Sequence, residues 1–160
     1  MIKYISKGDI FASDAEVYVN PVNLFGVMGA GLALEFKNEF PKMFKEYKAL
    51  SDKGETKFGN LHVYEVSEEE NPDYEGLVII NFPTKSSWKN PSQLEYIKVG
   101  MEALINIIKE DGYQSVALPA LGCGLGGLNW ADVKKIIEEY CNQLPEVEFE
   151  VYEPLIKAHR

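Results

Sequence analysis

Apolar residues along the chain occur either in short continuous runs or in longer stretches with helical spacing. The short runs are rich in Val, Ile, Leu and Tyr and predict six strands, at Ile2–Ser6, Val17–Val22, Leu61–Val66, Leu77–Phe82, Ser115–Pro119 and Glu148–Tyr152. Apolar positions that recur every three or four residues predict four helices, at Ala30–Asn38, Pro41–Lys53, Pro91–Asp111 and Trp130–Gln143. Because strands and helices alternate, we expect an α/β domain with helices on both faces of a mostly parallel sheet.

Prolines, glycines and one asparagine mark the ends of the predicted helices. Pro41 and Pro91 suit first-turn positions, where the missing N–H is harmless. Asp111-Gly112 predicts the end of the long helix, and Asn129 is a suitable N-cap for the last one. The sequence contains no internal repeat and no linker, so we expect a single domain over residues 1–160.

Composition and charge narrow the choice of protein class. No apolar run approaches the roughly 20 residues of a membrane span, and the N-terminus has no signal-peptide pattern, so we expect a cytoplasmic protein without a membrane partner. The net charge of −9 argues against nucleic-acid binding by bulk electrostatics. Between residues 84 and 100, however, three lysines face a single acid, Glu95, which predicts a local basic edge.

Ligands of such sheets bind beyond the carboxyl ends of the strands, and three loops there carry unusual residues. The first loop contains Gly26, Gly29 and Gly31 just before a helix. Glycines allow a ligand to approach the backbone closely, and the free N–H groups of a helix N-terminus favour an anion. The alternative is a glycine-rich turn that only lets the helix pack tightly.

The second loop is PALGCGLGGLNW, residues 119–130, between a strand and a helix. It contains a literal G-x-G-x-x-G, but that fingerprint normally opens a βαβ unit, and only one strand remains here. A loop that wraps a phosphate with backbone N–H groups is the interpretation that survives. The sequence also lacks the G-x-x-x-x-G-K-[ST] pattern of P-loop nucleotidases.

The third loop is NFPTKSSWKNP, residues 81–91, which follows an apolar strand. Lys85 is expected at the carboxyl end of the sheet, where a partly desolvated amine can attack a sugar C1. The alternative is an ordinary solvated lysine, one of 15 in the chain. Trp88 can either stack on a base or serve as a core aromatic.

Other chemistries have less support from the sequence. His62 belongs to an apolar strand and His159 to the tail, so neither is placed to activate Cys123 or to complete a zinc site. Cys123 is interpreted as a small residue in a tight loop. We therefore expect no metal site and no cofactor.

Five motifs together resemble the macro domain family of ADP-ribose binders, across nearly the whole chain. They are GDI, VNPVN, GVMGAGLALEF, NFPTK and PALGCGLGGLNW. The TK and GCGL segments are similar to the subgroup that contains the DarG antitoxin macro domain and the terminal ADP-ribose glycohydrolases. The resemblance implies a three-layer α/β/α fold with a central mixed, mostly parallel sheet.

The resemblance also implies a role for individual residues. Asp9 would hold the adenine amino group beside the backbone of Ile10, and Asn23 would contact the distal ribose. Asn20 matches the same motif but is expected to be a buried hydrogen-bonding residue. The diphosphate would be enclosed by two loops, formed by Val27, Met28, Gly29, Ala30 and Gly31 and by Leu121, Gly122, Cys123, Gly124, Leu125 and Gly126.

Lys85 matches the family's catalytic lysine, which attacks C1 of the distal ribose. Two departures from related patterns matter. The terminal glycohydrolases have an aspartate where this chain has Gly126, whereas the DarG type has glycine. The MacroD-type hydrolases have an aspartate in the helix after the first loop, where this chain has Ala33-Leu34.

The resemblance implies a hydrolase that removes ADP-ribose from nucleobases of single-stranded DNA, with Trp88 and Lys89 on the nucleic-acid side. We expect the protein to be a monomer. Two alternatives stay open. One is hydrolysis of a smaller or protein-linked substrate, such as ADP-ribose-1''-phosphate, O-acetyl-ADP-ribose or a glutamate ester. The other is a reader that binds ADP-ribose without catalysis.

Overall fold

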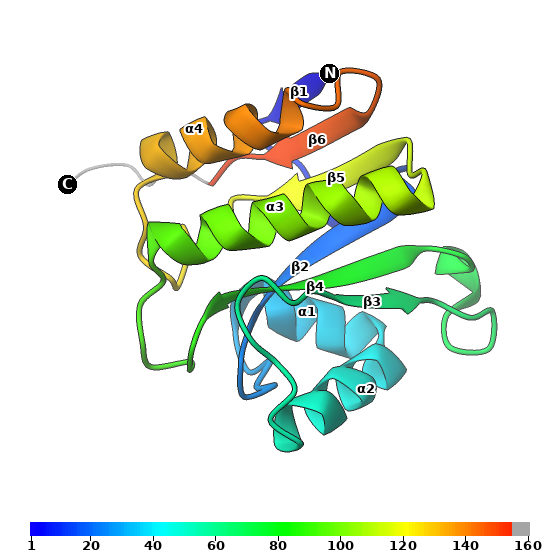
Figure 1. The fold of residues 1–160 in the computed structure, drawn as a ribbon. Helices are drawn as coiled ribbons and strands as arrows, with labels where there is room; N and C mark the ends of the chain where they lie inside the picture. Colours follow the sequence, from blue (N-terminus) through cyan, green and yellow to red (C-terminus); the bar gives the residue numbers. More distant parts are fainter. Residues whose placement is uncertain (155–160) are drawn as a thin grey trace.

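The computed structural model describes residues 1–154, which contain a six-stranded sheet in the order β1-β6-β5-β2-β4-β3 (Figure 1). The strands are β1 Ile2–Ile5, β2 Val17–Asn23, β3 His62–Glu65, β4 Val78–Lys85, β5 Ser115–Pro119 and β6 Glu148–Tyr152. Within the described residues, β3 pairs antiparallel with β4 and the other pairings are parallel. The predicted mixed, mostly parallel sheet is confirmed.

Four helices cover the two faces of the sheet, which confirms the three-layer α/β/α architecture. They are α1 Gly31–Glu39, α2 Pro41–Asp52, α3 Leu94–Asp111 and α4 Trp130–Cys141. Figure 1 shows α3 and α4 side by side on one face, with α1 and α2 at the opposite face beside β2 and β4. We expect a single domain over residues 1–160, and the last six of these residues, 155–160, lie outside the described residues.

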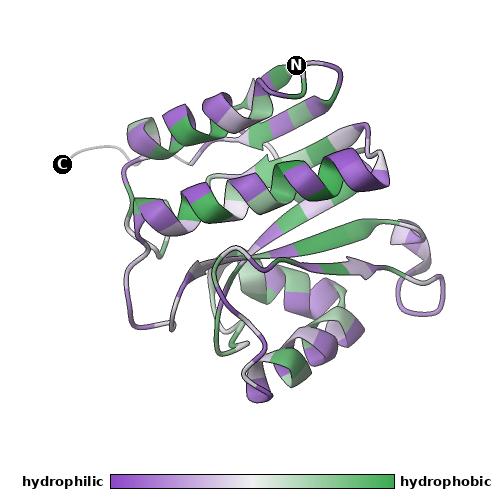
Figure 2. Cartoon of the chain, viewed as in Figure 1, coloured by the Kyte–Doolittle hydropathy of each residue, from purple (hydrophilic) through white to green (hydrophobic). Residues whose placement is uncertain are grey.

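The two faces of the central strands enter two separate hydrophobic cores. In β2, Val17 and Val19 pack toward α3 and α4, whereas Tyr18 and Val22 pack toward α1 and α2. In β4 the alternation repeats, with Ile80 on the first face and Ile79 on the second. Both central strands therefore carry buried apolar side chains on both faces, and β4 is green over its first part in Figure 2. Full burial of such a side chain contributes about 1.5–3 kcal/mol, which fixes the register of these strands.

The ends of the elements lie within two residues of the predictions except at the start of α3 and at the end of β4, which runs to Lys85 rather than to Phe82. Gly112 ends this helix in the left-handed conformation with φ of 74°, and Asn129 caps α4 by accepting the N–H of Ala131 at 2.9 Å. Two single-turn 3₁₀ helices, η1 Ile10–Ala12 and η2 Pro72–Tyr74, were not predicted, because so short a segment carries no periodicity.

The prediction that α3 begins at Pro91 is wrong, since the helix begins at Leu94. The Ser92 N–H donates to the carbonyl oxygen of Gly126 at 3.0 Å, and Gln93 is extended with φ of −128° and ψ of 147°. Residues 91–93 therefore join the third loop to the second instead of forming a first helical turn.

Candidate functional site

The three loops singled out in the sequence meet at one edge of the sheet, because the strands before them are parallel neighbours. β2 lies between β4 and β5, and all three strands end at the same edge, on the left in Figure 1. The register places Asn23, the last residue of β2, beside Lys85, the last residue of β4. The carboxyl edge of the sheet is therefore where these residues can act together.

Asn23 shapes the first glycine loop from within. Its Oδ1 accepts the N–H groups of Phe25 at 3.0 Å and Val27 at 3.2 Å, and its Nδ2 donates to the Val27 carbonyl at 2.8 Å. The side chain is only 4% exposed. Contact between Asn23 and a ribose stays a prediction; the contacts in the structure belong to the loop itself.

The first loop leads into a helix whose N-terminus has no side-chain cap. Ala30 is the N-cap residue of α1, and Gly31 follows with a left-handed φ of 58°. Val27, Gly29, Ala30 and Gly31 are exposed, and the backbone N–H groups of the last three are accessible to an anion, whereas that of Val27 donates to Asn23.

Two residues of the predicted set lie beneath the first loop rather than on its surface. Met28 is 1% exposed, with its Sδ 3.9 Å from Nδ2 of Asn20. Asn20 is fully buried and donates to Oδ1 of Asn81 at 2.9 Å. These side chains support the loop from below.

The second glycine loop is a compact series of turns that touches the first loop. The Cys123 N–H donates to the Ala120 carbonyl, and the Leu128 N–H donates to the Gly122 carbonyl. The Leu125 side chain reaches toward the first loop, where its Cδ1 lies 3.4 Å from the position that a Cβ on Gly31 would take. The two loops therefore flank a common space.

Gly126 has no room for a side chain. A Cβ at this position would lie 2.5 Å from the Gly122 carbonyl oxygen and 2.4 Å from Oγ of Ser92. The aspartate that the terminal glycohydrolases carry there does not fit this loop conformation. A general acid at residue 126 is thus excluded by geometry as well as by residue type.

Cys123 is not activated as a nucleophile. Burial raises the pKa of its thiol to about 11, so the thiol is protonated at neutral pH. The nearest hydrogen-bond partner of Sγ is the Leu121 carbonyl oxygen at 3.6 Å. His62 is engaged elsewhere, with Nε2 2.6 Å from Glu46 and Nδ1 2.9 Å from Nδ2 of Asn81.

Lys85 is the last residue of β4 and pairs with Asn23, where the first glycine loop begins. The residue is partly buried, and its Nζ donates to the Trp88 carbonyl oxygen over 3.4 Å, a long and weak hydrogen bond. Trp88 itself is 61% exposed, with Nζ of Lys89 5.1 Å from the centre of its ring. The alternative that Trp88 is a core aromatic is therefore wrong.

The predicted adenine end of the site coincides with a hollow of about 320 Å³. Asp9 is exposed there and accepts the Phe11 N–H at 3.0 Å, while Ile10 is buried. The hollow is lined by the predicted residues Asp9 and Ile10 together with five residues that the sequence analysis missed: Gly8, Leu32, Glu35, Pro119 and Tyr152.

Two signals in the sequence point to some of the missed residues. Pro119 and Tyr152 end two parallel strands, so the rule that placed the loops also places them. Leu32 and Glu35 are three residues apart in α1 and therefore share a helix face. The proximity of that face to Asp9 depends on the packing of α1 and could not be read from the sequence.

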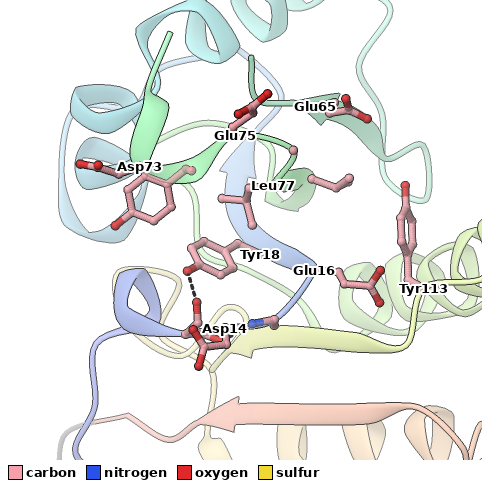
Figure 3. A pocket seen from close by; sticks show the side chains of 13 residues that line it. Asp14, Glu16, Tyr18, Glu65, Asp73, Glu75, Leu77 and Tyr113 are labelled. Carbon is pink, nitrogen blue, oxygen red and sulfur yellow. Dashed lines mark hydrogen bonds between the residues drawn. The ribbon is translucent and has the colours of Figure 1, made fainter. Parts of the chain in front are cut away.

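A second hollow, of about 400 Å³, lies at the other edge of the sheet and has the wrong charge for a diphosphate (Figure 3). Its lining includes five carboxylates, from Asp14, Glu16, Glu65, Asp73 and Glu75. Figure 3 shows these side chains around Tyr18 and Leu77, with no glycine loop of the site among them. The acid-free loops at the carboxyl edge suit an anion better.

The described residues offer no group of three or more His, Cys, Asp or Glu side chains arranged to hold a metal ion. Across residues 1–154, no helix combines the length and the apolar character needed to cross a membrane.

Comparison with known proteins gives relatives that match over most of this chain. A DNA ADP-ribosyl glycohydrolase of Mycobacterium tuberculosis is 44% identical over 154 residues, which are 96% of this chain and 42% of the relative. The solved macrodomain of Mycobacterium tuberculosis DarG superimposes with a TM-score of 0.89 at 42% identity, covering 96% of this chain and 98% of that one. This chain therefore spans less than half the length of the curated relative and nearly all of its solved macrodomain.

A solved structure of Thermosipho africanus DarTG in complex with ADP-ribose also has a TM-score of 0.89, at 34% identity, over 99% of this chain and 43% of that one. The model of the Macro domain family matches residues 19–137, which include all three loops. With the fold, the loops and the family model in agreement, the chain belongs to the macro domain family.

Proposed function

We propose that the chain binds ADP-ribose at the carboxyl edge of its sheet and hydrolyses the bond that joins it to a base of single-stranded DNA. The observation that carries this proposal is the position of Lys85 beside Asn23, where the first glycine loop begins. The names of the relatives support it, since one is a DNA ADP-ribosyl glycohydrolase and another was solved with ADP-ribose.

The ligand would extend along the edge from Asp9 to Lys85. Adenine would enter the hollow beside Asp9 and Ile10, and the diphosphate would receive N–H groups from the uncapped start of α1 and from the second loop. The distal ribose would then lie between the two loops, with its C1 toward Lys85. No metal is needed in this arrangement, because the proposed phosphate ligands are backbone amides.

Lys85 would supply the chemistry in two steps. Its unprotonated amine would attack C1 of the distal ribose as the bond from C1 to the base breaks, and the base would take the bonding electron pair and a proton from water. Water would then cleave the bond between C1 and Nζ, which releases ADP-ribose and restores the lysine. The same amine in its charged form could act electrostatically on the leaving group, as an alternative role.

The test is release of ADP-ribose from a single-stranded oligonucleotide that carries one ADP-ribosylated base. Wild type is compared with Lys85→Ala and with Lys89→Ala, a matched control in which an exposed lysine of the same loop is lost. We expect Lys85→Ala to lower the rate at least a hundredfold, with Lys89→Ala changing it less than tenfold, in the range of about 10²–10⁴ that one catalytic group supplies.

ADP-ribose affinity of each variant, measured by calorimetry, separates catalysis from binding. Retained affinity with lost release supports a catalytic Lys85. Release from O-acetyl-ADP-ribose or ADP-ribose-1''-phosphate but not from DNA would select the smaller substrate, which the net charge of −9 favours over a polyanion. Binding without release from any substrate would leave a reader.

A further inference from the structure

Large apolar side chains are exposed at the same edge of the sheet as the proposed site. The described residues expose six large hydrophobic side chains, and four of them belong to the three loops: Phe25, Val27, Trp88 and Leu125. Phe25 is 59% exposed and Trp88 is 61% exposed. A single exposed hydrophobic residue is ordinary, but a concentration of them at one edge indicates a contact surface.

The backbone around Phe25 is hydrogen-bonded and packed against α2, while its ring is exposed to solvent. The Phe25 N–H donates to Oδ1 of Asn23 at 3.0 Å. The next residue, Gly26, has a left-handed φ of 70°, and a Cβ there would lie 3.1 Å from Cα of Lys48 in α2. The loop thus packs closely on α2 on one side and presents the aromatic ring to solvent.

Phe25 and Trp88 lie on two loops that are joined beside Lys85. The Leu24 N–H donates to the Ser86 carbonyl oxygen at 3.1 Å, one residue after the pairing of Asn23 with Lys85. Phe25 is the residue after Leu24 in the first loop, and Trp88 is two residues after Ser86 in the third loop. In the binding mode proposed above, a base attached to C1 of the ribose at Lys85 would therefore lie near both loops.

The charge of this edge differs from that of the rest of the molecule. The chain has 25 acidic residues, but residues 20–30, 84–94 and 119–129 contain none. Lys85 and Lys89 are the charged residues of these three segments, and Nζ of Lys89 lies 5.1 Å from the Trp88 ring centre. An anionic partner with planar groups fits such a surface, because aromatic rings stack on base faces and lysines neutralise phosphates.

We infer that Phe25 and Trp88 form a stacking surface for the unpaired bases that flank the ADP-ribosylated base, which makes single-stranded DNA the substrate form recognised by this edge. This inference rests on the proposed function and adds a residue, Phe25, that the resemblance does not assign. A duplex does not fit, because its base faces are covered by the neighbouring base pairs. A peptide offers few planar faces and no regular negative charge.

The experiment measures KM and kcat for release of ADP-ribose from three substrates. They are an ADP-ribosylated oligonucleotide with normal flanking bases, the same oligonucleotide with abasic flanking sites, and the ADP-ribosylated mononucleotide. Phe25→Leu and Trp88→Leu remove the aromatic face but keep apolar bulk, and Phe25→Tyr keeps the face. Val63→Ala, at an exposed hydrophobic residue of β3, serves as the control for general loss of surface apolar area.

We expect Phe25→Leu and Trp88→Leu each to raise KM for the normal oligonucleotide by about 5- to 100-fold, in the range of base stacking. Phe25→Tyr and Val63→Ala should change KM less than twofold. The two leucine variants should have no effect on the abasic oligonucleotide or the mononucleotide, and their ADP-ribose affinity should equal that of wild type. Equal KM changes for all three substrates, or none, overturn the inference.

A binding measurement separates this inference from the proposed hydrolysis. Anisotropy of a labelled, unmodified single-stranded oligonucleotide should report weaker binding to Phe25→Leu and Trp88→Leu than to wild type, even if wild type releases no ADP-ribose. Weaker binding by the two variants, together with no release by wild type, would keep the stacking surface and reject the reaction. If wild type releases ADP-ribose but the two leucine variants bind the oligonucleotide as tightly as wild type, the stacking surface is rejected. It is also rejected if the same variants raise KM for an ADP-ribosylated peptide as strongly as for DNA.

Discussion

Two glycines of the second glycine loop differ in the space available for a side chain. Gly124 is open, with nothing within 4 Å of the position that a Cβ would take, whereas Gly126 would place a Cβ 2.5 Å from the Gly122 carbonyl oxygen. Neither residue has a left-handed φ, so the difference is steric. Gly126 is therefore required by the close approach of two turns, and Gly124 is not.

Replacing Gly126 by alanine should destabilise the protein, because the added methyl group must displace the backbone at Gly122. Overpacking of this kind costs about 1–3 kcal/mol, which a urea unfolding curve resolves. Gly124→Ala, two residues away, should change the free energy of unfolding by less than about 0.5 kcal/mol, as is usual for surface positions. Equal effects of the two substitutions would contradict this account of the loop.

At the scale of elements, the position of Lys85 depends on how α3 packs on β4. Gly100 lies in the middle of α3, and a Cβ there would be 2.2 Å from Cζ of Phe82. Phe82 lies in the same strand as Lys85, three residues earlier. The missing side chain lets the helix approach the strand around the Phe82 ring, and this contact holds the strand that carries the amine.

Gly100→Ala tests this contact, because helix propensity and packing predict opposite signs. Alanine in a helix interior is favoured over glycine by about 1 kcal/mol. We expect a net loss of stability nonetheless, since the ring of Phe82 is fully buried and cannot move away freely. The free energy of unfolding should recover at least partly in Gly100→Ala/Phe82→Leu, and a stabilised single variant would show that the contact is unimportant.

At the scale of the whole molecule, several tyrosine and cysteine side chains, which titrate at high pH, are buried or partly buried in their neutral forms. Burial raises the pKa of Cys141 from 9 to about 12 and is the main cause that raises the pKa of Tyr152 from 10 to about 12. The pKa of Tyr47 is also raised, mainly by burial. Since the folded state resists loss of these protons, their contribution to stability is fully present below pH 9 and is lost as pH rises toward 12.

The urea midpoint of unfolding should therefore be little affected by these groups between pH 7 and pH 8.5 and should fall steadily from pH 9 upward. Cys141→Ala removes one such group, so its midpoint should fall less steeply between pH 9 and pH 11 than that of wild type, after correction for the lost packing at neutral pH. A midpoint that stays constant up to pH 11 would rule out this origin of alkaline sensitivity.

The sequence alone predicted most of the fold, because strand and helix patterns are local. The six strands, the four helices and the stop at Gly112 follow from periodicity and from residue type over a few neighbours. The same reasoning placed Lys85 and both glycine loops at the carboxyl edge, since parallel strands end together. Motif resemblance supplied the family.

Other features depend on contacts between residues far apart in the chain, which only the tertiary structure decided. The start of α3 at Leu94 follows from a hydrogen bond between Ser92 and Gly126, and Gly126 tolerates no side chain because of where Gly122 lies. The exposure of Phe25 depends on the packing of its loop against α2. Hydrophobicity along the sequence would place such a ring in a core, whereas in the fold the adjacent Gly26 packs against α2 and the Phe25 ring is left exposed.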